Sequence, residues 1–149
     1  MADCVFCKIV SGEYTSSKIY EDDSILAFMD IQPVNEGHIL ITPKKHVELI
    51  ADLDDETSAK MIKLANRINN ALRKSGVKLE GVNYFLADGE AAGQEVFHTH
   101  LHLIPRFKDD GFGFIFPEGY RLILPEREKL NEIAEKIQEK FQKLDELMP

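Results

Sequence analysis

Three histidines alternate with other residues in the stretch FHTHLHLIPR, residues 97–106. The stretch is rich in β-formers and reaches Pro105, which a helix interior tolerates badly, so we expect a strand that ends there. Alternate side chains of a strand share one face, which places His98, His100 and His102 together. The opposite face is expected to be core, and its residues are Phe97, Thr99, Leu101 and Leu103.

A row of imidazoles suits three kinds of chemistry: a metal site, a nucleophile with proton-handling partners, or a phosphate-binding face. The spacing alone leaves these three open. Two strand histidines two residues apart can share a metal ion. All three span too far for one tetrahedral ion, at about 3.3 Å per residue. A site with all three histidines on one ion is therefore the least favoured.

Cys4 and Cys7 form a CxxC motif, which is a common zinc half-site and a common redox motif. The redox version usually follows a strand of a βαβ unit, and no strand is expected before this motif. A structural zinc site needs two further ligands, because such sites are tetrahedral with sulfur and nitrogen donors. The candidate ligands are His38, His46 and the three alternating histidines.

The composition fits one domain of a soluble protein, since 44% of the 149 residues are hydrophobic and 30% are charged. The net charge of -8 argues against a nucleic-acid partner, which clustered positive charge would attract. We find neither an apolar run that could span a membrane nor a basic segment followed by a long apolar one at the N-terminus. We therefore expect a cytoplasmic protein with no membrane partner.

The remaining pattern predicts an α+β fold, with helices on one side of a mostly antiparallel sheet. SSKIYEDDSILAFMDI reads as two strands joined by a turn at residues 21–24, and HILITPKKH as a strand that ends at Pro43. LDDETSAKMIKLANRINNALRKSG has apolar residues at helical spacing. GVNYFLADG and EVFHTHLHLIPR should pair as antiparallel strands. A short element is expected at residues 5–10 and an amphipathic helix at about 125–148, with apolar positions through Met148.

The segments CVFCKIVSGE, DIQPVNEGHILITPKKH and AGQEVFHTHLHLIPR together resemble the histidine triad (HIT) family, in its zinc-containing bacterial and archaeal branch. The resemblance implies a single HIT domain over residues 1–149. Its fold is an antiparallel sheet of about five strands with two main helices. It also implies a homodimer in which the two sheets join into one.

The resemblance further implies a structural Zn²⁺, whose ligands would be Cys4, Cys7, His46 and His98. It assigns the nucleophile to His100, which would attack the α-phosphorus of a purine nucleotide conjugate and form a nucleotidyl-histidine. Water would then release the mononucleotide. The expected substrates are nucleoside phosphoramidates or dinucleoside polyphosphates. The alternative is a nucleotide-binding or scaffold protein of the same fold without significant turnover.

The same resemblance names the residues around the substrate. Phosphate contacts would come from His102, the Gln94 side chain and backbone amides near Gly93, while His38 would orient groups or relay protons. Asp30 would accept hydrogen bonds from the ribose hydroxyls. The base would lie among apolar side chains, namely Phe6, Ile9, Phe28 and Ile31.

Two positions depart from the family pattern. Ala87 stands where many members have Asn, and Glu95 stands where many have Ser or Thr. Ala87 cannot make the side-chain hydrogen bond of an Asn, and Glu95 brings negative charge toward the phosphate. Both departures bear on binding strength and substrate choice, and neither concerns the nucleophile.

Overall fold

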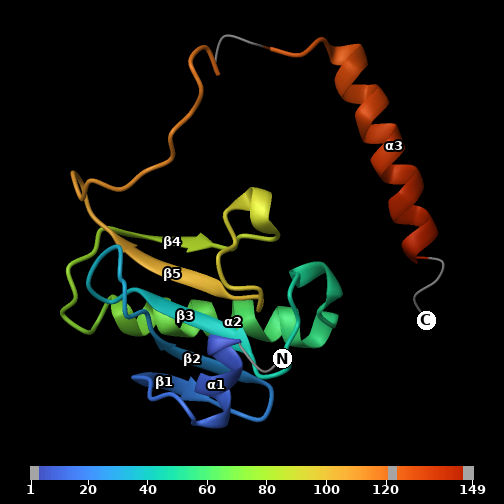
Figure 1. Ribbon diagram of the computed structural model, residues 1–149. Coiled ribbons are helices and arrows are strands. Elements are labelled where there is room, and N and C mark those ends of the chain that lie inside the picture. The colour runs from blue at the N-terminus through green and yellow to red at the C-terminus, as the bar shows by residue number, and fades with distance from the viewer. Residues whose placement is uncertain (1–3, 121–123, 146–149) are drawn as a thin grey trace. The chain divides into compact units, whose positions relative to one another are not determined.

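The computed structural model describes residues 4–120 and 124–145. Its centre is one antiparallel sheet with the strand order β1-β2-β3-β5-β4 (Figure 1). The strands are β1 (Lys18–Glu21), β2 (Ile25–Met29), β3 (Ile39–Pro43), β4 (Gly81–Phe85) and β5 (Leu101–Arg106). The predicted hairpin of β1 and β2 and the antiparallel pairing of β4 with β5 are both confirmed.

One face of the sheet is covered by α2 (Asp55–Leu72). The buried residues of α2, such as Leu64 and Ile68, pack against Ile25 and Ile41 of the strands. The helix begins at the N-cap Asp54, whose carboxylate accepts a hydrogen bond from the amide of Thr57 at 2.8 Å. Caps of this kind contribute about 1 kcal/mol. The predicted central helix is therefore present, and its apolar stripe forms the main core.

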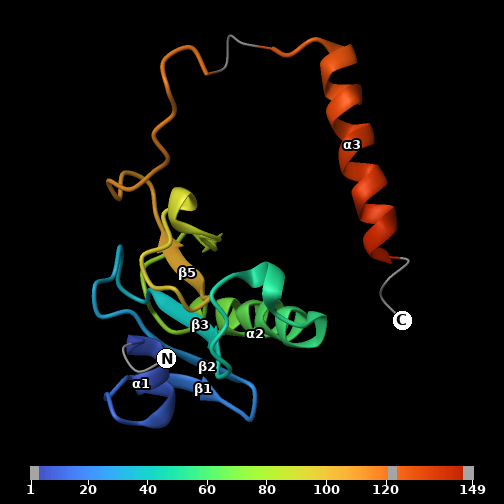
Figure 2. The same cartoon turned by 45° about the vertical axis from the view of Figure 1, so that its right-hand side comes forward.

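The opposite face of the sheet carries α1 (Val5–Ser11), so the expectation that all helices lie on one side was wrong (Figures 1 and 2). Side chains of β2 alternate between the faces, and Leu26 and Phe28 therefore point away from α2. Phe6 of α1 packs against them and against Leu40. This smaller core holds α1 next to the three-histidine segment.

Strand β5 begins at Leu101, so only His102 of the three histidines lies in a strand. The pairing of β5 with its neighbour β3 ends at Ile41, which lies opposite Leu101, and the Thr99 amide donates instead to the carbonyl of Val47 at 2.7 Å. The predicted core position of Phe97 was also wrong, since this residue is 45% exposed. Pro105 does not end the strand. The pairing of β3 with β5 reaches only Leu103, so at Pro105 no β3 residue needs the amide hydrogen that proline lacks.

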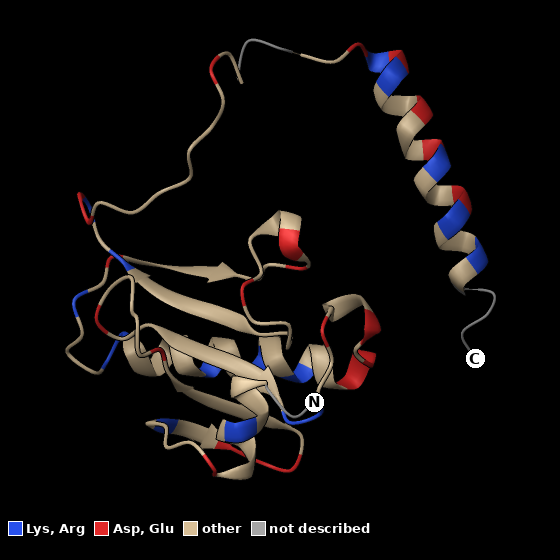
Figure 3. Ribbon diagram, viewed as in Figure 1, with Lys and Arg blue, Asp and Glu red and all other residues tan. Residues whose placement is uncertain are grey.

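A second unit of the chain begins at Gly113 and contains α3 (Arg127–Asp145), within the range expected for the C-terminal helix. Met148 lies outside the described residues. Lys and Arg alternate with Asp and Glu along α3 (Figure 3). Its large apolar side chains are exposed, and they are Leu130, Ile133, Ile137, Phe141 and Leu144. Within residues 4–120 and 124–145, no helix has the length and apolar character needed to cross a membrane.

Candidate functional site

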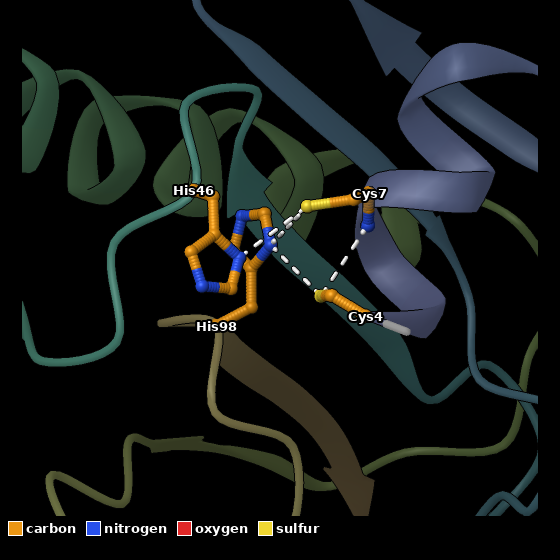
Figure 4. Close-up of side chains that lie close together, drawn as sticks. All are labelled: Cys4, Cys7, His46 and His98. Atoms are coloured by element: carbon orange, nitrogen blue, oxygen red, sulfur yellow. Dashed lines mark hydrogen bonds between the residues drawn. The ribbon is translucent and has the colours of Figure 1, made fainter. Parts of the chain in front are cut away.

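Four side chains of types that can bind a metal ion meet at one end of α1, and we call them the four-donor cluster: Cys4, Cys7, His46 and His98 (Figure 4). Cys4 is the N-cap of α1, and its Sγ accepts the amide hydrogen of Cys7 at 3.5 Å. His46 comes from the loop after β3, and His98 from the bend before β5. All four ligand atoms lie within 4.8 Å of one another.

The distances in the four-donor cluster fit a tetrahedral ion. Zinc bonds of about 2.3 Å to sulfur and about 2.0 Å to nitrogen place a sulfur and a nitrogen about 3.5 Å apart. The observed distances to His98 Nδ1 are 3.5 Å from Cys4 Sγ and 3.6 Å from Cys7 Sγ. Cys7 Sγ lies 3.3 Å from His46 Nδ1. The donor set of two thiols and two imidazoles is one that structural zinc uses.

Hydrogen bonding prepares His98 as a ligand. Its Nε2 lies 2.8 Å from the carbonyl oxygen of Pro43, which can only accept, so Nε2 carries the proton. The lone pair is therefore on Nδ1, the atom that faces the two thiols. Burial also lowers the pKa of His98, which keeps the ring neutral. Burial and the Cys4 side chain raise the pKa of Cys7, and a bound cation would reverse this because metal binding displaces the thiol proton.

A cavity of about 560 Å³ lies beside this cluster, within the size range of small-molecule sites. It is lined by several side chains expected around a nucleotide: Phe6, Ile9, Phe28, Asp30, Ile31, Gly93, His38, His100 and His102. Ile31 is at the mouth, since it lines the cavity and is 93% exposed. The structure thus brings together most of the residues that the sequence pointed to.

His100 is buried and has one fixed tautomer. Its Nδ1 lies 2.7 Å from the carbonyl oxygen of His98, so Nδ1 carries the proton and donates it to that oxygen. Nε2 of the neutral ring then keeps its lone pair. Burial lowers the pKa of His100, so the ring is neutral at pH 7. The edge of Phe6 packs against it with ring centroids 4.9 Å apart. The neutral ring therefore has a lone pair on Nε2, which is a group that can act as a nucleophile.

His38 and His102 form a hydrogen-bonded pair. The amide of Val34 donates to His38 Nδ1 at 3.2 Å, so His38 Nε2 carries the proton and donates to His102 Nδ1 at 2.9 Å. This leaves His102 with a hydrogen on Nε2. Burial, together with the nearby His100 and His38, lowers the pKa of His102 to about 4. His102 is thus a neutral hydrogen-bond donor, and His38 fixes its tautomer.

The charged side chains along the cavity are acidic. Asp30 and Glu95 line it, and the described lining residues include no Lys or Arg. Asp30 Oδ1 accepts the amide hydrogen of Gln32 at 2.8 Å, and Oδ2 lies 3.5 Å from His38 Nδ1. Ala87 also lines the cavity. Both departures from the family pattern therefore face the space that a ligand would occupy.

Gln94 is the one expected phosphate contact that does not line the cavity. Its side chain is buried and bonded to backbone: Oε1 accepts from the amide of Gly89 at 2.7 Å, and Nε2 donates to the carbonyls of Glu48 at 2.7 Å and Val96 at 3.1 Å. These bonds hold the loop that carries Gly93, whose φ of +88° favours glycine. Gln94 is thus connected to the site through this loop.

Sequence reasoning missed several residues of the cavity wall, among them Tyr14, Thr15, Ser16 and Phe85. Phe85 could have been found, because it is paired with His102 across β4 and β5. The residues at 14–16 gave no signal, since they follow α1 in a turn without a repeating pattern.

Comparisons with known proteins agree on one family. A model of the HIT domain matches residues 11–109. An uncharacterized HIT-like protein of Borreliella burgdorferi is 48% identical over 138 residues, which are 92% of this chain and 97% of that protein. Adenylylsulfatase HINT3 of Arabidopsis thaliana is 42% identical over 108 residues, 72% of this chain and 54% of that protein. The crystal structure of a Zn-bound histidine triad family protein from Mycobacterium smegmatis has a TM-score of 0.71 and 41% identity, covering 81% of this chain and 87% of that one.

Proposed function

Because this chain belongs to the HIT domain family, we propose that it is a nucleotide hydrolase or nucleotidylyl transferase that forms a covalent bond between His100 and the α-phosphorus of its substrate. The observation that carries the proposal is the hydrogen bond from His100 Nδ1 to the His98 carbonyl. It leaves the lone pair on Nε2 of a ring that lines the cavity.

The reaction proceeds in two displacements. In the first, the Nε2 lone pair of His100 attacks the α-phosphorus, and the bond from phosphorus to the leaving group breaks. The leaving group departs with that electron pair and takes a proton from solvent. In the second, water attacks phosphorus and the bond to Nε2 breaks, which releases the mononucleotide and a proton and restores His100. Covalent catalysis of this kind divides one difficult step into two easier ones.

Negative charge on the non-bridging oxygens is stabilised by fixed donors. His102 Nε2–H is one of them, since its Nδ1 is held by His38. Backbone amides near Gly93 are the others. We assign Gln94 to holding this loop, because its side chain already bonds to three backbone groups.

Nucleoside binding uses the opposite part of the cavity. Asp30 accepts hydrogen bonds from the ribose hydroxyls. The base lies against an apolar wall made of Phe6 and Ile9 of α1, Phe28 of β2, and Ile31, which follows β2. An apolar slot with one acceptor is an arrangement that small-molecule sites commonly use.

The charge of the cavity favours phosphoramidates over dinucleoside polyphosphates. Asp30 and Glu95 are acidic, and no described lining residue is Lys or Arg. A polyphosphate leaving group adds negative charges that nothing in this lining neutralises. Repulsion between two unit charges about 4 Å apart costs about 1 kcal/mol even in water. The similarity to an adenylylsulfatase also supports cleavage next to an adenylyl phosphorus.

Zinc is the ion we propose for the four-donor cluster, on the donor types, their distances and the Zn-bound relative. The ion would tie α1 to the segment before β5 and contribute its binding free energy to folding. No step of the reaction passes through it.

We also propose a homodimer in which the sheet continues across β4. This strand is at one edge of the sheet, and its sequence GVNYF has no charged residue. The other edge, β1, carries Lys18 and Glu21 and an irregular register, which are features that discourage edge pairing. Light scattering should give twice the chain mass, and the outer amides of β4 should be protected from hydrogen exchange. A monomer by mass would exclude the dimer.

The experiment that tests the catalytic proposal is intact mass spectrometry after quenching without acid, with adenosine phosphoramidate as substrate. The expected result is a transient adenylyl adduct that maps to His100 and is absent from His100→Ala. The variant should still bind AMP. Absence of both adduct and released AMP would overturn the proposal in favour of a nucleotide-binding protein without turnover.

A further inference from the structure

One peptide unit connects the four-donor cluster to the nucleophile. The His98 side chain is a member of the cluster, and the His98 carbonyl accepts the hydrogen of His100 Nδ1 at 2.7 Å. We propose that metal binding by the cluster positions this carbonyl and thereby selects the His100 tautomer that leaves Nε2 free. His98 is then a positioning residue as well as a ligand. The catalytic consequence rests on the proposed function, whereas the structural link does not.

The peptide between His98 and Thr99 is not part of a strand, since β5 begins at Leu101. Two neighbours hold it instead. The Thr99 amide donates to the carbonyl of Val47 at 2.7 Å, and Val47 follows the ligand His46 directly. The imidazole of His98 is fixed between the Pro43 carbonyl and the thiols. One side of the peptide whose oxygen orients His100 is therefore anchored by the proposed ligand His98, and the other by the residue that follows the proposed ligand His46.

Helix α1 supplies a second connection. Phe6 lies between the two cysteines in sequence, and its ring packs edge-on against His98 at 5.9 Å and His100 at 4.9 Å between centroids. The helix has only seven residues, and helices of this length are marginal without tertiary support. An ion held by Cys4 and Cys7 therefore also keeps Phe6 against the nucleophile.

The test compares the zinc-loaded chain with Cys4→Ser/Cys7→Ser, which lacks both sulfur donors. Long-range ¹H–¹⁵N spectra report the protonated nitrogen of His100 without any substrate. We expect the loaded chain to show Nδ1–H alone and the metal-free variant to show a mixture of both tautomers. We expect kcat of the variant to fall roughly 10- to 100-fold, the usual effect of losing support around a functional site.

Lys8→Ser is the matched control, because it places the same residue type in α1 without removing a donor. It should keep the single tautomer and its kcat. The link is wrong if the folded, metal-free variant retains Nδ1–H alone and full kcat. If the loaded chain hydrolyses nothing, the proposed function fails, but the spectra still decide whether metal and tautomer are linked.

A second variant covers the case in which the double variant does not fold. Cys4→Ser keeps three donors, and Ser is a favoured N-cap residue for α1. Because this variant should bind zinc more weakly, its zinc occupancy can be varied by adding zinc to one folded protein. The proposal requires the Nδ1–H fraction of His100 and kcat to rise together with zinc occupancy. Values that stay constant while occupancy rises would overturn it.

Discussion

Replacing Gln94 by Ala distinguishes a residue that holds the loop from one that touches the phosphate. The substitution removes three hydrogen bonds, to the amide of Gly89 and to the carbonyls of Glu48 and Val96. Gln94 is 4% exposed, so water does not easily replace the lost hydrogen bonds. At about 1 kcal/mol for each bond, the free energy of unfolding should fall by about 3 kcal/mol. For a chain of this size the melting temperature should drop by roughly 6–12 °C.

The assay is urea unfolding followed by circular dichroism, together with hydrolysis of adenosine phosphoramidate below the unfolding transition. Glu95→Ala serves as the control, since its exposed side chain makes no hydrogen bond within the described residues and its loss should change stability by less than about 0.5 kcal/mol. Should Gln94→Ala keep its stability and lose hydrolysis all the same, the loop-holding role is wrong. Gln94 would then contact the phosphate directly.

Three further predictions follow from the site and the core. Glu95→Gln removes about 1 kcal/mol of charge repulsion, so it should raise kcat/KM for diadenosine polyphosphate about fivefold relative to kcat/KM for adenosine phosphoramidate. Steady-state kinetics with both substrates measures this ratio, and an unchanged ratio would contradict the charge argument. Burial lowers the pKa of His102 to about 4 in the folded chain, whereas the unfolded value is about 6.5, so between pH 6.5 and pH 4 the unfolded chain binds more protons than the folded one. The stability contributed by neutral His102 is therefore complete above pH 6.5 and is lost as the pH falls to 4. The urea midpoint of His102→Asn should depend less on pH in this window than that of the unmodified chain. Gly37→Ala should destabilise the fold by about 1–3 kcal/mol, because φ is +85° and a Cβ would lie 3.0 Å from Val77 Cγ1 and 3.2 Å from Pro105 Cγ. Thermal unfolding measures this loss. Gly76→Ala is the control, since Gly76 also has a positive φ but a Cβ there would meet no atom within 4 Å.

Much of the fold could be predicted because its signals are local. The apolar repeat of α2 and the alternation in β2 follow from the periods of a helix and a strand. The turn at Asp22 follows from its residue types, and the carboxylate does accept amide hydrogens from Ser24 and Ile25. These elements required no knowledge of distant residues.

The positions of α1 and of the start of β5 could not be predicted in the same way. The face on which α1 lies is decided by Phe6, which joins Leu26 and Phe28 from another part of the chain. The start of β5 depends on where its pairing with β3 ends, at Ile41 opposite Leu101. One of the loop-holding bonds of Gln94 likewise reaches Glu48, which is 46 positions away. Tertiary contacts decide each of these features, and a local pattern does not encode them.

The three alternating histidines show the same limit inside the site. Their spacing predicts a common face but assigns no role, because a role depends on which nitrogen of each ring is protonated. That choice comes from elsewhere in the chain: the Pro43 carbonyl for His98, the His98 carbonyl for His100, and His38 for His102. As a result, the His98 ring directs its lone pair toward two thiols, the His100 ring keeps a lone pair on Nε2, and the His102 ring carries a hydrogen on Nε2. The proposed roles of metal ligand, nucleophile and phosphate donor therefore depend on these backbone and side-chain partners, which give identical residues at equal spacing three different combinations of protonation state and surroundings.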